Sequence, residues 1–307
     1  MYNDKENETY NIRVRQSCNI VYEDDTFRAD NNSEVKKKVY ENMIKNDHFS
    51  VEGNLKLFSP KFYEIMKNIQ KFIDQEGNPS GKILYYSDFR HESGSEVFEK
   101  ILNANGYEKY DSEKKDIQEI IQNKNKKKRY TFITGNETQE ERKINKDAFN
   151  HKENIYGEYL QIILISKSGA EGISLKCVRQ VHIMEPFWNY IRVDQVLGRA
   201  IRMESHNELP EDKRNVEQYL YLSMLPDGNS PEEIFLSMKE LHWNEVENIE
   251  YTNNIKNILF KEHKSVYKTI LKLLSMKKET KGRSIDQVLF DIMEKKHLIS
   301  NKITNII

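Results

Sequence analysis

The stretch LQIILISKSGAEG, residues 160–172, decides the fold class expected of this chain. Its first half is a short apolar run typical of a buried central strand, and a turn rich in glycine follows at once. The other expected strands cover residues 82–86, 130–133, 180–184 and 216–223, and the expected helices cover residues 58–73, 96–102, 139–149 and 190–203. Strands that alternate with helices predict a mostly parallel sheet with helices on both faces.

Changes in composition predict three parts along the chain. Residues 1–55 are rich in charges and asparagine and are expected to form a charged, partly ordered leader. Residues 56–224 hold the alternating strands and helices. Residues 225–307 show apolar residues at spacings of three and four, which predicts a helical insertion and closing brace helices.

Bulk composition excludes several classes of protein. The 307 residues are 37% apolar and 32% charged, with a net charge of −1, so only local patches would attract nucleic acid. Two distant cysteines, Cys18 and Cys177, indicate a reducing compartment and no disulfide framework. No apolar run reaches 18 residues and the first residues are polar, so we expect neither a membrane span nor a signal peptide. The expected location is intracellular.

The segment DQVLGRAIR, residues 194–202, holds the candidate catalytic residues Gln195, Arg199 and Arg202. Two arginines three residues apart are expected on one face of a helix. A guanidinium offers a fixed fork of donors to a transferred phosphoryl group, and such a finger raises the rate about 10³–10⁵-fold in other NTPases. Gly198 would let the phosphates approach closely. The alternative is a surface helix whose arginines are merely solvated.

The turn after the predicted central strand is a candidate phosphate site. Gly169 and Gly172 lie at the carboxyl end of that strand, where open α/β sheets bind ligands. Glycines in such a turn let backbone amides approach phosphate oxygens. The signal is weak alone, and it gains weight because it precedes the arginine segment by about 20 residues.

Three further features each have two interpretations. Trp188 could stack on a base or simply pack the start of the following helix. The basic run at 124–129 could contact a phosphate backbone, although most such runs are solvated loops. His182 lies within a predicted strand, which favours a core histidine over a ligand.

Taken together, the segments resemble the C-terminal, RecA-like lobe of superfamily 2 helicases on their Swi/Snf-like branch. They look most like the transcription ATPases of large DNA viruses, such as poxvirus nucleoside triphosphatase I and the small subunit of the early transcription factor. SKSGAEGISL, from residue 166, is similar to motif V, and DQVLGRAIR is similar to motif VI. The resemblance implies cofactor contacts from Gly169, Glu171, Gly172 and Gly198, and nucleic-acid contacts from Ser166, Lys167, Ser168, Trp188 and Asn189.

The resemblance also implies ATP and Mg²⁺ as cofactors and DNA or RNA as a partner. No G-x-x-x-x-G-K-[ST] loop and no D-E-x-[HD] box occurs in the sequence, so we expect no ATP hydrolysis by this chain alone. A first lobe from another polypeptide or from upstream sequence would complete the two-lobed ATPase. The transcription machinery is a further expected partner. For a viral protein, the resemblance implies a cytoplasmic location, in the virus factory or the virion.

Two alternatives to half of a helicase stay open at this point. One is a non-catalytic accessory module that holds nucleic acid or a partner protein through the helices between residues 225 and 281. The other is a relic fragment of a helicase gene. The joint presence of Gln195, Arg199 and Arg202 favours the catalytic interpretation, because a pure adaptor has no physical need for that combination.

Overall fold

The computed structural model describes residues 12–22, 33–111, 116–169, 172–224 and 284–304. The chain divides into two compact units, the first made of Met1–Ser223 with Leu289–Ile307 and the second of Met224–Val288. Most of the second unit lies outside the described residues, so the predicted insertion between residues 225 and 283 stays a prediction. The description below concerns the first unit.

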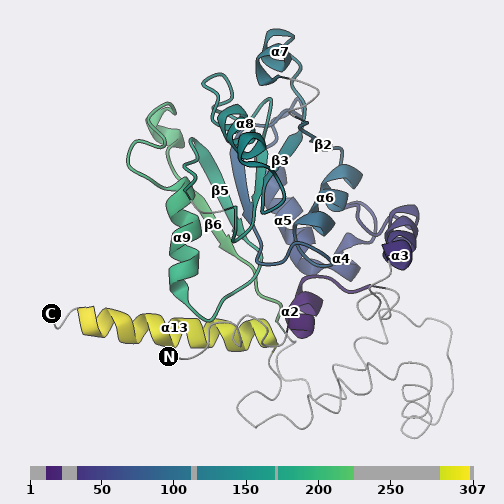
Figure 1. The fold of residues 1–307 in the computed structure, drawn as a ribbon, viewed down its shortest axis with the longest axis vertical. Coiled ribbons are helices and arrows are strands. Elements are labelled where there is room, and N and C mark those ends of the chain that lie inside the picture. The colour runs from purple at the N-terminus through teal and green to yellow at the C-terminus, as the bar shows by residue number, and fades with distance from the viewer. Residues whose placement is uncertain (1–11, 23–32, 112–115, 170–171, 225–283, 305–307) are drawn as a thin grey trace, which may run out of the picture. The chain divides into compact units, whose positions relative to one another are not determined.

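A parallel sheet forms the centre of the first unit (Figure 1). Its strands are β1 (Lys82–Tyr86), β2 (Glu108–Lys109), β3 (Arg129–Ile133), β4 (Ile162–Ile165), β5 (Val178–Ile183) and β6 (Glu217–Leu220). Their order across the sheet is β2-β3-β4-β1-β5-β6, and every pairing is parallel. The predicted fold class, a mostly parallel α/β sheet of the RecA-like kind, is confirmed. Strand β2 is too short and too polar to be predicted from its sequence.

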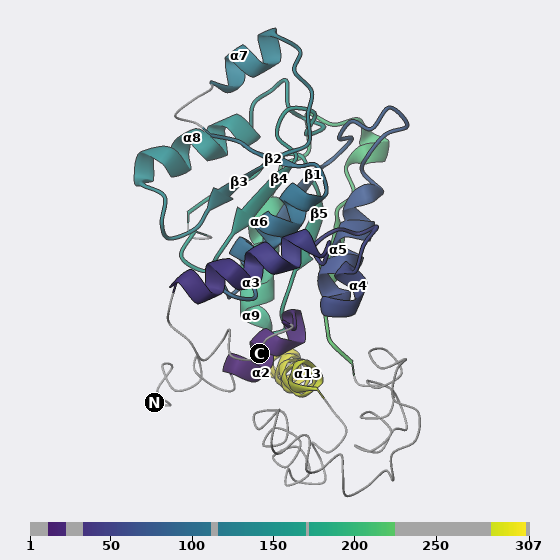
Figure 2. The same cartoon turned by 90° about the vertical axis from the view of Figure 1, so that its right-hand side faces the viewer.

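Helices lie along both faces of this sheet (Figure 2). The described helices are α2 (Ile12–Asn19), α3 (Ser33–Lys45), α4 (Leu55–Phe58), α5 (Pro60–Gln70), α6 (Ser95–Ala104), α7 (Ile117–Gln122), α8 (Gln139–Phe149), α9 (Tyr190–Ala200) and α13 (Ile285–Thr304), with a 3₁₀ turn at Glu211–Lys213. Helix α5 lies within the predicted range 58–73 and begins at Pro60, where the Ser59 side chain accepts from the Phe62 amide and caps the helix. The predicted brace helix near the C-terminus corresponds to α13.

Alternate residues of each strand pack on opposite faces, as the pleat of a strand requires. Ile83 and Tyr85 belong to the core under α3, α5 and α6, whereas Leu84 and Tyr86 belong to the core under α8 and α9. All five residues of β1 are buried, which fits a central strand covered on both sides. Met293 of α13 is also buried in the second of these cores.

Described residues of the segment 1–55, expected to be a charged, partly ordered leader, pack into the core of the first unit. Helix α3 buries Met43, and Ile20 and Phe49 belong to the same core as β1. The expected boundary at residue 55 also coincides with the start of α4. Few apolar residues, spread among many charges, supply these contacts, so the average composition of the segment concealed them.

His182 is a core histidine, as its position in a strand predicted. Its ring is fully buried on β5, with Nδ1 2.7 Å from the Tyr221 hydroxyl and Nε2 3.1 Å from Oε1 of Gln180. The ring also stacks on Tyr219 and Tyr221. Burial, with a smaller contribution from the charge of Lys71, lowers the pKa of His182 from 6.5 to about 3.

This shift predicts acid lability. Between about pH 6.5 and 3 the unfolded chain binds a proton that the folded chain does not, so the free energy of unfolding falls as the pH falls. The contribution of His182 is a loss of about 1.4 kcal/mol per pH unit. The raised pKa of Glu185 contributes in the opposite direction between about pH 7 and 4.5, so the His182 contribution is the difference in slope between the unchanged protein and a His182 variant. Urea unfolding at pH 7.5 and pH 5 measures it. His182→Gln should remove the His182 contribution, so its stability should fall less, or rise more, from pH 7.5 to pH 5 than that of the unchanged protein. Equal slopes in the two proteins would contradict the assignment.

Candidate functional site

The two segments predicted to carry chemistry lie side by side in the structure. The glycine-rich turn follows β4 directly, and the chain after it is joined by backbone hydrogen bonds to the end of α9. The Leu175 amide donates to the Arg199 carbonyl at 2.9 Å, and the Cys177 amide donates to the Ser205 carbonyl at 2.8 Å. Residues from the two motifs can therefore act on one ligand.

The glycine-rich turn is tightly packed at Gly169. This residue is buried, and a Cβ added to it would lie 1.7 Å from the Ile133 carbonyl oxygen at the end of β3. Gly172 is exposed with a φ of 72°, a conformation that favours glycine. Glu171, predicted to contact the cofactor, lies outside the described residues. The turn thus touches the neighbouring strand at one glycine and faces solvent at the other.

The polar residues expected to contact nucleic acid form the rim of this turn. Lys167 and Ser168 are exposed, whereas Ser166 is buried at the end of β4. The hydroxyls of Ser166 and Ser168 are 3.1 Å apart and hydrogen-bonded. The structure therefore presents one cation and one hydroxyl to solvent beside the glycines.

Helix α9 carries two of the three predicted catalytic residues, Gln195 and Arg199. The Asn189 side chain caps its start by accepting from the Ile191 amide at 2.9 Å. Val193, Val196 and Ala200 are buried against the sheet, whereas Gln195 is exposed. A Cβ added to Gly198 would meet nothing within 4 Å. Packing within the described residues therefore does not require glycine at position 198.

Arg202 does not share the face of α9 with Arg199, which corrects the expectation from the sequence. The helix ends at Ala200 rather than at residue 203. The Ser205 hydroxyl donates to the Ala200 carbonyl and accepts from the Arg202 amide, which holds the chain in a turn. Exposed Arg202 folds back, and its Nε donates to the Gly198 carbonyl at 2.8 Å. Both arginines still lie at the same end of the helix.

Arg199 has an unusual environment for an arginine. Its side chain is half-buried, and its Nε is enclosed by protein without a hydrogen-bond partner in the described part of the chain. A buried donor without an acceptor costs about 1–3 kcal/mol. Among the described residues the Nε of Arg199 therefore has no acceptor.

Trp188 and Asn189 take different positions at the start of α9. Asn189 is the helix cap, a structural role. Trp188 is half-buried, and Nζ of Lys296 on α13 lies 4.1 Å from its ring centre. Its indole nitrogen is buried without a partner among the described residues. Of the basic run at 124–129, Arg129 is buried and donates to the Asn125 and Tyr159 carbonyls, so it is structural.

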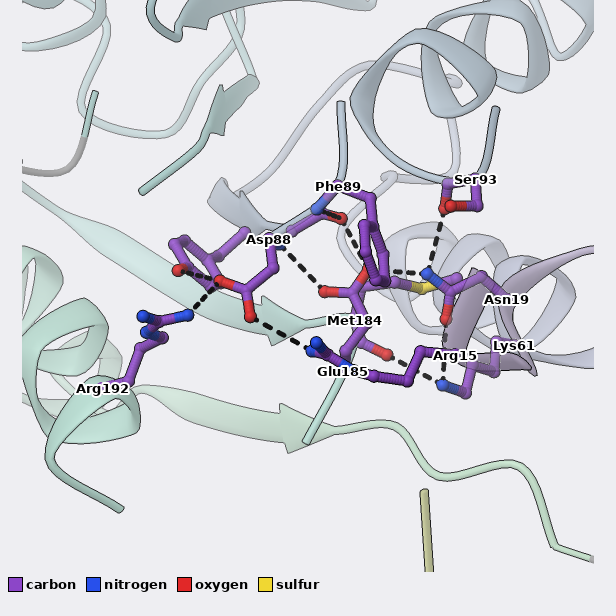
Figure 3. Close-up of polar contacts among 11 residues, drawn as sticks. Arg15, Asn19, Lys61, Asp88, Phe89, Ser93, Met184, Glu185 and Arg192 are labelled. Atoms are coloured by element: carbon purple, nitrogen blue, oxygen red, sulfur yellow. Dashed lines mark hydrogen bonds and ion pairs between the residues drawn. The ribbon is translucent and has the colours of Figure 1, made fainter. Parts of the chain in front are cut away.

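A buried cluster of charges, missed from the sequence, lies between the carboxyl ends of β1 and β5 (Figure 3). Connections leave these neighbouring strands in opposite directions, which makes their ends the switch point where open α/β sheets commonly bind ligands. Here the chain itself supplies Arg15 and Asn19 of α2 to that place. Arg15 contacts Asp88, which follows β1, at 3.4 Å. Asn19 donates to Glu185, which follows β5, at 2.6 Å.

Glu185 is the centre of this cluster. Its carboxylate accepts from the Asn19 amide and the Ser87 hydroxyl at 2.6 Å and from the Asp88 backbone amide at 3.0 Å. Lys61 completes the surroundings by donating to Asn19 and to the Met184 carbonyl, both at 3.1 Å. Burial, reinforced by the charge of Asp88, raises the pKa of Glu185 to about 7, against the hydrogen bonds and Lys61, which lower it.

One sequence signal could have indicated the cluster. Asp88 and Glu185 each follow an apolar run directly, and parallel neighbours bring such residues to one edge of the sheet. The basic partners could not be found in this way, because Arg15 lies in the segment taken for a leader. Among the described residues, no group of three or more His, Cys, Asp or Glu side chains could hold a metal ion. No helix described by the structure is long and apolar enough to span a membrane.

Comparison with known proteins identifies the central part of the chain. Residues 64–204 match the family described as the helicase conserved C-terminal domain. A protein of Acanthamoeba polyphaga mimivirus, provisionally named an ATP-dependent RNA helicase, is 31% identical over 216 residues, covering 70% of this chain and 33% of that protein. A termination factor NPH-I homolog of African swine fever virus is 34% identical over 191 residues, covering 54% of this chain and 26% of that protein.

Among solved structures, the C-terminal part of the Fun30 ATPase domain shares 17% identity with this chain at a TM-score of 0.40. That match covers 88% of this chain and 75% of the other. The chain spans about a quarter to a third of the length of the two viral relatives.

Proposed function

We propose that the chain is the second lobe of an ATP-dependent nucleic-acid helicase or translocase, because residues 64–204 match the family described as the helicase conserved C-terminal domain. A first lobe with a P-loop and an acidic box would complete the ATP site. The names of the two viral relatives, an ATP-dependent RNA helicase and a termination factor, support ATP as substrate and a role in transcription.

Arg199 is the observation that carries the proposal. It lies on the last turn of α9, half-buried, with its Nε enclosed and unsatisfied in the described residues. Directly before it, Gly198 leaves open space where a side chain would stand. A poorly satisfied cation beside an unfilled space matches a group that donates to a ligand held by another lobe.

The chemistry proposed for this lobe is stabilisation of charge on the transferred phosphoryl group. Arg199 and Arg202 would donate to phosphate oxygens, and Gly198 would allow the close approach. Gln195, exposed one turn before Arg199, would orient the same ligand. The amides of the turn at Gly169 and Gly172 would lie near the phosphates. Mg²⁺ and most contacts with ATP are assigned to the first lobe, where the family's P-loop and acidic box occur.

Nucleic acid would run along the carboxyl edge of the sheet beside the same turn. Lys167 and Ser168 are exposed there and suit a phosphate backbone, one as a cation and one as a hydroxyl donor. The two lobes would close on ATP and open after hydrolysis, and this cycle would move the carboxyl edge of the sheet along the nucleic-acid strand. The viral relatives support a location inside an infected cell, in the cytoplasm or the virion.

The first experiment measures nucleic-acid-stimulated ATP hydrolysis by this chain alone and with a first lobe. The first lobe of the mimivirus relative, supplied as a separate polypeptide, is a suitable partner. We expect hydrolysis at background level from the chain alone, because its sequence contains no P-loop, and stimulated hydrolysis from the mixture. Phosphate release over time gives the rate, and the first lobe alone is the control.

Three results would contradict the proposal. Hydrolysis by the chain alone would mean that it holds ATP by other residues. A mixture no faster than the first lobe alone would favour a non-catalytic accessory module. A stimulated rate that does not depend on Arg199 would remove the proposed chemistry of this lobe.

A further inference from the structure

We propose that Arg192, held by Asp88, is a positioning residue that fixes the arginine Arg199 in its working place. The proposal rests on the proposed function and adds to it a residue outside the segments that resemble known motifs. It follows from the buried charge cluster and from the place of Arg192 on α9 (Figure 3).

The contact between Arg192 and Asp88 is short and sheltered from water. NH1 of Arg192 lies 2.8 Å from Oδ1 of Asp88, and the two side chains are 18% and 11% exposed. The Arg192 guanidinium also lies 3.5 Å from the centre of the Phe187 ring. A stacked and paired arginine has little freedom to move, and screening by salt is weak at such burial.

Asp88 is itself fixed from several sides. The Tyr86 hydroxyl donates to its Oδ1 at 2.6 Å, and Arg15 approaches its Oδ2 at 3.4 Å. Its backbone amide donates to Glu185, which ties the end of β1 to the end of β5. Arg192 is therefore paired with a buried carboxylate that several other contacts hold in place, and not with a loose surface carboxylate.

Helix α9 transmits this anchoring to Arg199. Seven residues separate Arg192 from Arg199, which is close to two helical turns, so both project from one face about 10 Å apart. Arg192 lies in the first turn of α9, where a cation opposes the helix dipole. Intrinsic helix preference therefore does not explain an arginine there, whereas the contact with Asp88 does.

Val193, Val196 and Ala200 hold α9 against the sheet by apolar contacts, and the Arg199 carbonyl accepts from the Leu175 amide at 2.9 Å at the end of the helix. Apolar contacts are not directional, so they resist sliding and rotation of a helix less than a buried ion pair does. A phosphate-binding arginine must be placed closely, because an error of 1 Å can cost a factor of about 10² in rate. The ion pair with Asp88 adds a directional constraint at the start of α9, and the Leu175 amide supplies one at its end.

The test uses this chain reconstituted with the first lobe. Arg192→Ala should lower kcat for nucleic-acid-stimulated ATP hydrolysis about 10–100-fold, with a smaller change in KM for ATP. Arg192→Lys keeps the charge without the planar fork and should recover part of the loss. In the Arg199→Ala background, Arg192→Ala should cause no further loss, because a positioning residue acts only through the group that it positions.

Arg179 provides a matched control. It lies near the amino end of β5, is buried, donates to Asn215 and lies over the Phe72 ring, so it resembles Arg192 in burial and aromatic contact, although its hydrogen-bond partner is uncharged. Arg179→Ala should lower the melting temperature and leave kcat of the folded complex within about twofold of the unchanged protein.

Asp88→Asn is the second variant, should Arg192→Ala fail to fold. It preserves the volume of the side chain, removes its charge, and should lower kcat in the same direction. An unchanged kcat in a folded Arg192→Ala or Asp88→Asn protein would overturn the proposal, as would losses that add to that of Arg199→Ala. An activity indifferent to Arg199→Ala would instead overturn the proposed function itself, so the two failures are distinguishable.

Discussion

Replacing Arg199 with alanine is expected to lower ATP hydrolysis by the reconstituted two-lobed enzyme about 10³–10⁵-fold. The guanidinium would donate to the phosphoryl group in the transition state, and alanine leaves that charge without its donor. Phosphate release at saturating ATP and nucleic acid measures the effect. Arg202→Ala is expected to lower the rate as well, because Arg202 lies at the same end of α9.

The melting temperature of Arg199→Ala, unlike its rate of ATP hydrolysis, should not fall. The substitution removes an Nε that is buried without a partner in the described residues, so the melting temperature should stay equal or rise slightly. A variant that is inactive and fully folded would be the signature of a functional cation. A rate loss below tenfold, or a loss that tracks a lower melting temperature, would contradict the role given to Arg199.

Replacing Gly169 with alanine is expected to destabilise the lobe by about 3 kcal/mol. The new Cβ would lie 1.7 Å from the Ile133 carbonyl oxygen, so the end of β3 or the turn after β4 must move. The neighbouring atom belongs to the backbone, which cannot turn aside as a flexible side chain can. Thermal unfolding measures the effect, with a midpoint expected to fall by roughly 10 °C.

Gly198→Ala is the matched control, because both glycines lie in the candidate site. A Cβ at position 198 meets open space, and alanine is favoured over glycine inside a helix by about 1 kcal/mol. The isolated chain should therefore become more stable, while activity with the first lobe should fall because the methyl group obstructs the approach of the phosphates. If both variants were destabilised, the space beside Gly198 would not be one that is kept open for the phosphates.

The fold could be predicted because its central strands carry a local signal. The apolar run at 162–165 and the strand at 82–86 are continuous and bounded by polar turns, so both strands can be predicted from local sequence alone. The start of α8 was as clear, since Thr138 and Glu141 form a capping box. Strand ends were predicted less well, because pairing decides them: β5 begins at Val178, two residues before the expected start.

The site was predicted in its parts and missed in its arrangement. Arg199, Gly198 and the glycine-rich turn lie together as their motifs suggested. The end of α9 at Ala200 depends on the Ser205 hydroxyl, a contact five residues away that no periodicity reveals. The cluster around Glu185 depends on Arg15 and Asn19, about 170 residues earlier in the chain, and only folding brings such residues together.

Placing α2 at the switch point has a practical consequence for dividing this protein into fragments. The match to the helicase family begins at residue 64, after Arg15, Asn19 and Lys61. A fragment that begins at residue 64 would keep the buried acids Asp88 and Glu185. It would lose Arg15, Asn19 and Lys61, which surround them. Unpaired buried charges strongly disfavour folding. We therefore expect the smallest fragment that folds alone to be longer than the segment 64–204 that matches the family. Deletion series should begin before residue 12.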